Sequence, residues 1–345
     1  EIIPETMMDF ASNDYYGLAK THSPNSKQLS YGATGSRLIS GNSELAEKLE
    51  NFLANFHESE SALLFNSGYM ANIGLLSSVA DRNTTIIADE YIHASLKDGI
   101  RLSGASYYKF KHNNLQDLEQ KLRNVKNGNK CLVVVESVYS MEGDFAPLQE
   151  IVKLKQKYPF EIIVDEAHAT GIFGNGKGRV VEENLQNEVF ARVVTFGKAI
   201  GTHGAAVLGT HILKEYLINF ARSFIYTTAL PDIILQKTLD NHTFIIENKL
   251  YRDIKKRVLE FKEIVSKSAL SNYLLPSSSP IQIILAEGIL VENIENICRQ
   301  KGFFVKAIKY PTVPKNQERI RICLHLHNTS EQMNDLVKIM EKNWQ

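Results

Sequence analysis

The sequence predicts an α/β fold with a mostly parallel sheet in a large domain, followed by a smaller α+β domain. Between about residues 60 and 210, short β-branched runs alternate with helical patterns, as in strand–helix units. Several of these runs are apolar throughout, which is typical of parallel strands covered on both faces. The 345 residues exceed the usual size of a single-core domain, so a second domain is expected.

The first part of the chain contains the predicted sheet and two well-defined helices. The strands are predicted at residues 62–66, 84–89, 105–111, 132–137, 161–165, 193–197 and 205–210. Ser43 is a residue type that caps helix N-termini. The helix after it places Leu45, Leu49, Phe52, Leu53 and Phe56 on one face. Another helix has Pro147 at its first helical position.

The pattern changes after Pro231. Residues 232–266 predict a long charged helix, and the apolar run 281–285, a helix over 291–300 and a strand over 319–324 follow. We therefore expect an N-terminal arm (1–40), a large domain (41–231) and a small C-terminal domain (232–345).

Composition excludes several classes of function. The chain has 39 Lys plus Arg and 39 Asp plus Glu, so no basic field favours nucleic acid or a membrane surface. No apolar run approaches the roughly 20 residues of a membrane-spanning helix. Cys131, Cys298 and Cys323 are widely spaced, which predicts neither a disulfide framework nor a metal site. We expect a cytoplasmic enzyme that acts on small molecules.

Asp165 and His168 form the first candidate site. The segment Glu161-Ile-Ile-Val-Asp-Glu-Ala-His168 is an apolar strand that ends in a carboxylate, with a histidine three positions later. Side chains at the carboxyl end of a parallel strand face the ligand crevice. Strand alternation alone would separate the two residues, so the chain must turn after Asp165, which Gly171 permits. The ordinary alternative is a carboxylate satisfied by a helix N-terminus.

The same four residues, Asp-Glu-Ala-His, also match the metal-binding strand of a nucleic-acid helicase. That function requires a phosphate loop of the form G-x-x-x-x-G-K-[ST] upstream. The nearest match, residues 171–178, lies downstream and has Gly178 in place of the hydroxyl that binds magnesium. The helicase interpretation is therefore disfavoured.

Lys198 is the second candidate. It lies in Val194-Thr-Phe-Gly-Lys-Ala-Ile-Gly-Thr-His-Gly204, where small residues let a planar ring approach the backbone. A lysine among apolar groups has a lowered pKa, and its neutral amine can attack an aldehyde to form a Schiff base. The alternative is an ordinary surface lysine.

Three further segments place polar residues after predicted strands. Ser67-Gly68 precedes a helix whose N-terminus could receive a phosphate, although a plain Ser67 cap would explain it equally well. His93 follows another strand, where its ring could stack on an aromatic cofactor, but a lone histidine is more often structural. The segment 136–144, which includes Ser140, places polar side chains at the carboxyl end of another predicted strand.

Together these segments resemble the α-oxoamine synthase family of fold-type-I enzymes that use pyridoxal 5′-phosphate (PLP), across nearly the whole chain. The resemblance rests on Ser12-Asn-Asp-Tyr15, Gly35-Ser-Arg-Leu-Ile-Ser-Gly-Asn42, Asp165-Glu-Ala-His168, Thr195-Phe-Gly-Lys198 and Ala307-Ile-Lys-Tyr-Pro-Thr-Val-Pro314. It implies that the large domain binds PLP.

The resemblance also implies the roles of the catalytic residues. Lys198 would carry PLP as a Schiff base and move protons at the substrate α-carbon. Asp165 would hold the pyridine nitrogen protonated, which makes the ring an electron sink. His168 would hydrogen-bond the phenolic oxygen, and His93 would stack on the ring.

Further contacts follow from the same resemblance. The other cofactor-binding residues would be Ser67, Gly68, Tyr69, Ser140, Thr195, Thr227 and Thr228. The last two would reach the phosphate from the neighbouring subunit of a homodimer. Asn13 and Arg321 would bind the amino-acid carboxylate, which suits a bidentate guanidinium, and Thr312 would contact the acyl substrate.

The segment 307–314 looks most like the family member that joins L-alanine to a pimeloyl thioester in biotin synthesis, with release of CO2 and free thiol. The thioester would be carried by coenzyme A or an acyl carrier protein. Relatives that use glycine or serine to make aminolevulinate, 2-amino-3-ketobutyrate or ketosphinganine are the alternatives. Residues 19–31, near the thioester entrance, are fewer than the family pattern leads us to expect. A non-catalytic binding module is disfavoured, because it would not need Lys198, Asp165, His168 and His93 together.

Overall fold

The computed structural model describes residues 3–4, 6–21, 29–126, 128–286 and 288–344. The chain forms two compact units. The larger unit comprises Ala19–Val138 and Phe145–Asn248, and the smaller comprises Glu1–Leu18, Tyr139–Asp144 and Lys249–Gln345. Most of the short stretch 19–31, namely residues 22–28, lies outside the described residues.

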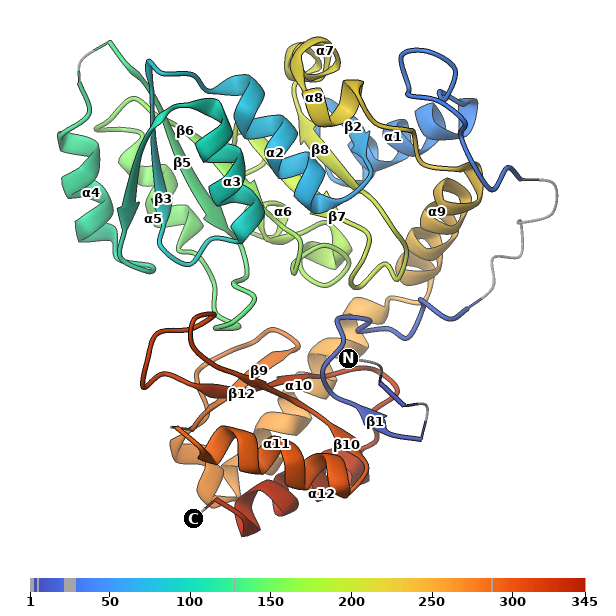
Figure 1. Cartoon of the computed structure of the whole chain (residues 1–345), viewed down its shortest axis with the longest axis vertical. Coiled ribbons are helices and arrows are strands. Elements are labelled where there is room, and N and C mark those ends of the chain that lie inside the picture. Colours follow the sequence, from blue (N-terminus) through green and yellow to red (C-terminus); the bar gives the residue numbers. More distant parts are fainter. Residues whose placement is uncertain (1–2, 5, 22–28, 127, 287, 345) are drawn as a thin grey trace. The chain divides into compact units, whose positions relative to one another are not determined.

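A seven-stranded sheet forms the centre of the larger unit (Figure 1). Its strands are β2 (Ser61–Phe65), β3 (Thr84–Asp89), β4 (Ser106–Phe110), β5 (Lys130–Glu136), β6 (Glu161–Asp165), β7 (Ala191–Thr195) and β8 (Ala205–Gly209). They lie in the order β2-β8-β7-β6-β5-β3-β4, and β8 runs antiparallel to both of its neighbours while the other pairs are parallel. The predicted α/β class with a mostly parallel sheet is confirmed.

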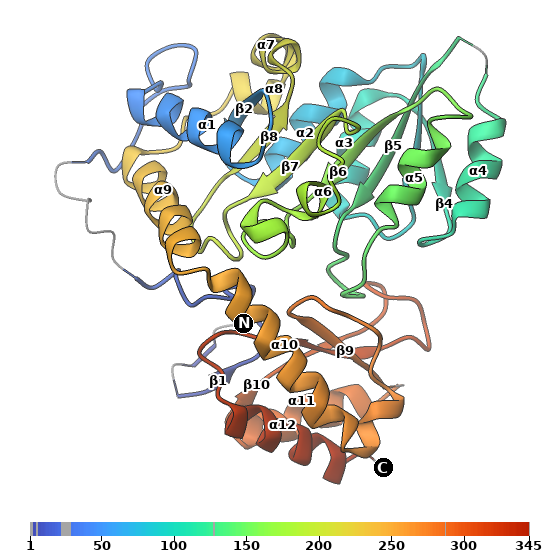
Figure 2. The same cartoon turned by 180° about the vertical axis from the view of Figure 1, so that it is seen from behind.

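Helices cover both faces of this sheet. They are α1 (Glu44–Phe56), α2 (Gly68–Val79), α3 (Ala94–Ser103), α4 (Leu115–Arg123), α5 (Leu148–Leu154), α6 (Arg179–Glu182), α7 (His211–Phe220), α8 (Arg222–Ile225) and α9 (Asp232–Glu247). The two opposite views show α2 and α3 on one face and α5 and α6 on the other (Figures 1 and 2). Ser43 caps α1 as predicted, because its side chain accepts a hydrogen bond from the Ala46 N–H. Pro147 occupies the cap position of α5, one residue before the predicted place.

The smaller unit packs helices against a three-stranded antiparallel sheet. The helices are α10 (Leu250–Ser266), α11 (Leu290–Gln300) and α12 (Ser330–Lys342), and the sheet has the order β11 (Lys306–Ile308), β12 (Arg319–Cys323), β9 (Ile281–Leu285). A separate parallel pair joins β1 (Met8–Asp9) to β10 (Phe303–Phe304). Among the described residues, no helix is long and apolar enough to cross a membrane.

The compact units differ from the sequence-based division in three places, one of which is the segment Tyr139–Asp144, predicted in the large domain but part of the smaller unit. The N-terminal residues join the smaller unit, because β1 pairs with β10 and Phe10 is buried in that unit's core. The segment 232–266 is two helices, interrupted at Lys249 with φ +53°. Helix α9 belongs to the larger unit, where Asp232 accepts a hydrogen bond from Ser43 at 2.7 Å.

Candidate active site

The predicted site residues of the larger unit follow the ends of its strands. Asp165 ends β6, Thr195 ends the neighbouring parallel strand β7, and Lys198 comes three residues later. His93 follows β3, and Ser67 follows β2. Because carboxyl ends of parallel strands share one edge of a sheet, this topology places these residues at the edge where α/β proteins hold their ligands.

Asp165 is buried and held in one orientation. Its Oδ2 accepts a hydrogen bond from Asn72 Nδ2 at 2.8 Å, and its Oδ1 accepts one from the Ala167 N–H at 2.9 Å. The predicted turn follows at once, since the Ala169 and Thr170 N–H groups both donate to the Glu166 carbonyl at 2.9 Å, and Gly171 adopts φ +82°. His168 is buried within this turn.

His93 is the N-cap of helix α3, and as a residue it remains exposed, which leaves room for a ligand to stack on its ring. Its Nδ1 lies 2.7 Å from Ser95 Oγ and accepts from the Ser95 N–H at 3.2 Å. Partial burial lowers the pKa of His93, and Lys198 acts in the same direction while Asp165 opposes it. Asp165 and Lys198 are therefore both close enough to His93 to influence its charge.

Lys198 lies on a tight loop between β7 and β8. The loop is closed by hydrogen bonds from the Phe196 N–H to the Gly204 carbonyl at 2.9 Å and from the Thr202 N–H to the Phe196 carbonyl at 2.8 Å. Gly204 has φ +112°, a conformation that favours glycine. The lysine is half-buried, so it is less enclosed than its apolar sequence neighbours suggested.

Side chains of helix α9 hydrogen-bond to this loop. Asn241 Nδ2 donates to the Ile200 carbonyl at 2.6 Å, and the hydroxyls of Thr202 and Thr238 are 2.8 Å apart. Both α9 side chains are buried. Because buried polar groups without partners are costly, these contacts favour one loop conformation.

The start of α2 matches a phosphate-binding helix N-terminus. Ser67 caps the helix by accepting from the Met70 N–H at 3.2 Å, and the first turn leaves N–H groups without intrahelical partners. A Cβ at Gly68 would lie 2.6 Å from Thr195 Cγ2, so this close approach requires glycine. Thr195 Oγ1 is buried without a hydrogen-bond partner in the part of the chain that the structure describes. A ligand that accepts or donates a hydrogen bond would satisfy it.

Tyr69 points to the surface of this region. It is 44% exposed, and its hydroxyl donates to Asp98 Oδ2 at 2.6 Å. The hydrogen bond to Asp98 raises the pKa of Tyr69. The hydrogen bond to Asp98 thus fixes the position of the ring, which remains partly exposed.

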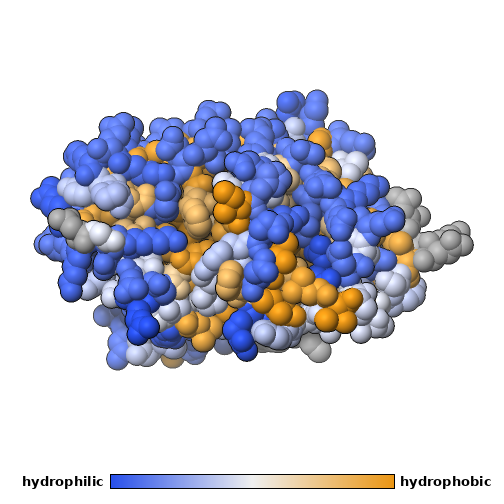
Figure 3. Space-filling view, turned by 90° about the horizontal axis from the view of Figure 1, so that it is seen from above, coloured by the Kyte–Doolittle hydropathy of each residue, from blue (hydrophilic) through white to orange (hydrophobic). Residues whose placement is uncertain are grey.

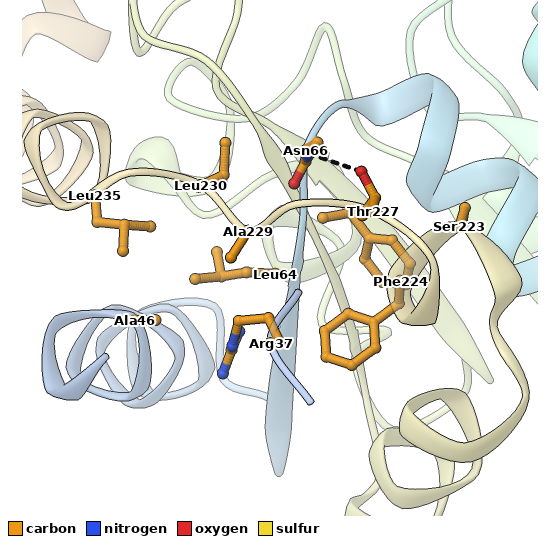
Figure 4. A pocket seen from close by; sticks show the side chains of 11 residues that line it. Arg37, Ala46, Leu64, Asn66, Ser223, Phe224, Thr227, Ala229, Leu230 and Leu235 are labelled. Carbon is orange, nitrogen blue, oxygen red and sulfur yellow. Dashed lines mark hydrogen bonds between the residues drawn. The ribbon is translucent and has the colours of Figure 1, made fainter. Parts of the chain in front are cut away.

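Thr227 and Thr228 lie beside the end of β2 in the same chain. Asn66 Nδ2 donates to Thr227 Oγ1 at 3.2 Å (Figure 4). It also donates to the Thr228 carbonyl at 2.7 Å. Thr227 lines a pocket with Arg37, whose guanidinium donates to the buried Glu50 at 2.7 Å. None of the other predicted site residues lines this pocket.

In the smaller unit, Arg321 donates hydrogen bonds to both Asn13 and Ser140. Its Nη2 donates to Asn13 Oδ1 at 2.9 Å and its Nε donates to the Ser140 carbonyl at 2.8 Å. Among the described residues no carboxylate pairs with Arg321, whereas Arg319 pairs with Glu142 at 3.2 Å. This contrast favours Arg321 as the arginine that binds an external anion.

Thr312 takes no part in these hydrogen bonds of Arg321. It is exposed in the connection between β11 and β12, where its N–H donates to the Lys309 carbonyl at 2.9 Å. A role in substrate contact stays a prediction.

Four polar side chains were missed by the sequence interpretation: Asn72, Ser95, Thr238 and Asn241. A signal existed for two of them. Asn72 and Asn241 occupy helix interiors, where asparagine is unfavourable unless a tertiary partner holds it. The partners themselves are distant in sequence, so the pattern could not identify them.

Comparison with known proteins gives consistent matches. The model of the family described as aminotransferase class I and II matches residues 5–339. An 8-amino-7-oxononanoate synthase of Emericella nidulans is 37% identical over 98% of this chain and 89% of its own length, and one of Lysinibacillus sphaericus is 37% identical over 96% and 87%.

Solved structures agree with these matches. The 8-amino-7-oxononanoate synthase of Francisella tularensis has a TM-score of 0.82 at 31% identity, with 98% of both chains covered. A serine palmitoyltransferase from S. paucimobilis with a bound PLP–myriocin aldimine has a TM-score of 0.91 at 26% identity, covering 98% of this chain and 87% of that one.

Proposed function

The chain belongs to the aminotransferase class I and II family and, within it, to the α-oxoamine synthases, and we propose that it is a PLP-dependent acyltransferase that makes 8-amino-7-oxononanoate. In this reaction L-alanine condenses with a pimeloyl thioester, and CO2 and free thiol leave. The observation that carries the proposal is the 37% identity to synthases of this name over nearly the full chain.

The larger unit fits PLP as its cofactor. The capped start of α2, the close approach of Gly68 to Thr195 and the unpaired Thr195 hydroxyl suit a phosphate-bearing ligand. The buried carboxylate of Asp165 suits a protonated pyridine nitrogen, because the charge pairing stabilises both groups. When bound, PLP supplies an aldehyde and an electron-accepting ring that acidifies the α-hydrogen of an amino acid.

The protein residues then divide the remaining work. The Lys198 amine would hold the cofactor and afterwards move a proton at the substrate α-carbon. His93 would cover one ring face and His168 would donate to the phenolic oxygen, with Tyr69 at the edge of the site.

Arg321 would bind the alanine carboxylate. Its guanidinium is positioned by Asn13 and the Ser140 carbonyl, and both interactions hold it in one plane. A fixed, planar guanidinium matches the two oxygens of a carboxylate. Thr312 remains our candidate for a contact with the acyl chain.

A second candidate reaction uses serine and a long-chain acyl thioester. It is favoured by the TM-score of 0.91 to serine palmitoyltransferase, although that enzyme shares only 26% identity with this chain. Glycine-using reactions of the same family are the further alternative. One methyl group separates alanine from glycine, and such a difference discriminates by only about 1–3 kcal/mol in a pocket.

The test is a matrix of substrates. L-alanine, glycine and L-serine are each assayed with acetyl, succinyl, pimeloyl and palmitoyl thioesters, on coenzyme A and on an acyl carrier protein, while CO2 and free thiol are measured. We expect the highest kcat/KM for alanine with a pimeloyl thioester. A maximum for serine with palmitoyl, or for glycine with acetyl or succinyl, would replace this reaction by another of the family.

We also propose a cytoplasmic homodimer with shared sites. Tyr31 and Ile39 are 83% and 85% exposed, and Leu38 and Tyr226 are exposed too. Figure 3 shows apolar surface of the chain among hydrophilic side chains on the face seen from above. If a second copy of the chain buried this surface, Thr227, which is next to Tyr226 in the sequence, would also lie at the interface between the two copies. The three cysteines are buried and form no disulfide, which suits a reducing compartment.

A further inference from the structure

We propose that Asn72 and Ser95 are positioning residues that connect the Asp165 carboxylate to the His93 imidazole and determine which ring nitrogen of His93 carries the proton. Neither residue belongs to the set assigned above. Both are buried, Asn72 on α2 and Ser95 on α3.

Asn72 uses both hydrogens of its amide group. Its Nδ2 donates to Asp165 Oδ2 at 2.8 Å and to Ser95 Oγ at 2.9 Å. The reverse orientation would place the amide oxygen against a carboxylate, where two acceptors repel. Asn72 Oδ1 has no hydrogen-bond partner among the described residues, so the two acceptors alone determine how the amide is turned.

Ser95 passes this constraint to His93. Because its Oγ accepts a hydrogen from Asn72, its own hydroxyl hydrogen is available for His93 Nδ1, 2.7 Å away. The backbone N–H of Ser95 points to the same nitrogen at 3.2 Å. A ring nitrogen that meets two donors must be unprotonated, so the proton of neutral His93 lies on Nε2.

The charged surroundings of His93 agree with a neutral ring. Partial burial, Lys198 and Lys97 disfavour the imidazolium, whereas Asp165 and Asp98 favour it, and the balance lowers the pKa of His93. Hydrogen bonds donated to Nδ1 favour the neutral form further.

Helices α2 and α3 pack closely where Asn72 and Ser95 meet. A Cβ at Gly99 of α3 would lie 2.9 Å from the backbone oxygen of Asn72 and 3.0 Å from Leu76 Cβ. Glycine therefore lets the two helices approach closely. That approach brings Ser95 within hydrogen-bond distance of Asn72.

The first test measures the tautomer directly and does not depend on the proposed function. Two-dimensional ¹H–¹⁵N NMR of the histidine rings is recorded on the full chain, with and without PLP, and His93→Gln assigns the signals. We expect the Nε2–H form in the wild type. Ser95→Thr, which keeps the hydroxyl, should preserve it. Ser95→Ala leaves only the longer backbone N–H contact to Nδ1, so part of the population should shift to the Nδ1–H form and the pH at which His93 titrates should rise. An Nδ1–H form in the wild type, or an unchanged Ser95→Ala spectrum, would overturn the assignment.

The second test addresses Asp165 and rests on the proposed cofactor. Asn72→Leu keeps the approximate shape but removes both donors, and we expect it to weaken PLP binding about tenfold or more, because hydrogen bonds to ionised groups are among the stronger ones. Ile73→Leu, on the same helix, is the matched control. Equal PLP affinity in Asn72→Leu and the control would refute the positioning role, whereas absence of PLP binding in the wild type would refute the proposed function and leave the tautomer test intact. Should Asn72→Leu fail to fold, the Ser95 pair still decides.

Discussion

At the scale of single residues, Lys198 combines partial burial with a rigid support. It is half-buried on a loop whose backbone is closed by internal hydrogen bonds and held by Asn241 of α9. A flexible side chain on a fixed backbone can form a covalent bond and later move to a neighbouring atom. Such mobility suits a residue with two successive tasks.

We predict that borohydride reduction of the PLP-loaded protein attaches the cofactor to Lys198. The physical reason is that borohydride reduces an imine to a stable amine, and the proposed function assigns the imine-forming amine to Lys198. Mass spectrometry of the digested protein locates the label, and Lys198→Ala should remain unlabelled. A label on another lysine would remove the basis of the proposed site.

Asp165 allows a second prediction at this scale. In Asp165→Asn, the amide nitrogen must face a donor, either Asn72 Nδ2 or the Ala167 N–H, and the negative charge is lost. We expect some PLP binding to remain, while the exchange of the alanine α-hydrogen with solvent deuterium slows about a hundredfold or more. NMR follows that exchange. An unchanged rate would exclude a charge-pairing role for Asp165, and Asp165→Glu tests whether charge or geometry matters more.

At the scale of elements, α9 connects a buried aromatic cluster to the lysine loop. His242 on α9 packs edge-on against Phe52, Phe56 and Phe196, with ring centroids 5.7 to 6.1 Å away. Phe196 lies two residues before Lys198. The position of α9 thus influences the loop through apolar packing as well as through Asn241.

The buried His242 predicts how stability depends on pH. Burial lowers the pKa of His242 from 6.5 to about 4, so the ring is neutral in the folded protein. The unfolded chain takes up a proton below about pH 6.5 while the folded chain does not. His242 therefore does not lower the free energy of unfolding above pH 6.5. As the pH drops from 6.5 toward 4, this residue lowers the free energy of unfolding by roughly 3 kcal/mol.

The variant His242→Phe should remove most of this dependence, because phenylalanine fits the aromatic cluster and does not titrate. Denaturant unfolding between pH 4 and 7.5 measures the slope. His203→Gln, at an exposed position, is the control and should keep the wild-type slope. An equal slope in His242→Phe would mean that other groups, such as the buried His57, dominate acid destabilisation.

At the scale of the whole molecule, the predicted site residues divide between two units. Lys198, Asp165 and His93 belong to the larger unit, while Asn13 and Arg321 belong to the smaller one. Residues 139–144, which contain Ser140, belong to the smaller unit, although the chain on both sides of them belongs to the larger unit. Under the proposed function, Lys198, Asp165 and His93 would act on the cofactor, and Asn13 and Arg321 would bind the amino-acid carboxylate.

The proposed homodimer predicts complementation. A Lys198→Ala chain and a Thr227→Val, Thr228→Val chain should each have little activity alone. When mixed and refolded, heterodimers would contain one site with an intact lysine and both intact threonines, so activity should return to at most half of the wild-type value per dimer. Activity that stays absent in verified heterodimers would indicate sites built from a single chain.

The sequence alone determined the local features of this protein. Strands β3 and β6 begin and end where the pattern predicted, Ser43 caps α1, and the chain turns after Asp165. These features depend on side-chain periodicity, capping and glycine conformation, which act over a few neighbouring residues. The candidate residues Asp165 and Lys198 were found for the same reason, because strand ends and small residues mark them locally.

Only the tertiary structure decided which distant residues meet. It placed α9 in the larger unit, Phe10 in the core of the smaller one, and Asn72 between Asp165 and Ser95. Such contacts join residues up to several hundred positions apart. Their energies depend on the burial of both partners together, which no short window of sequence contains.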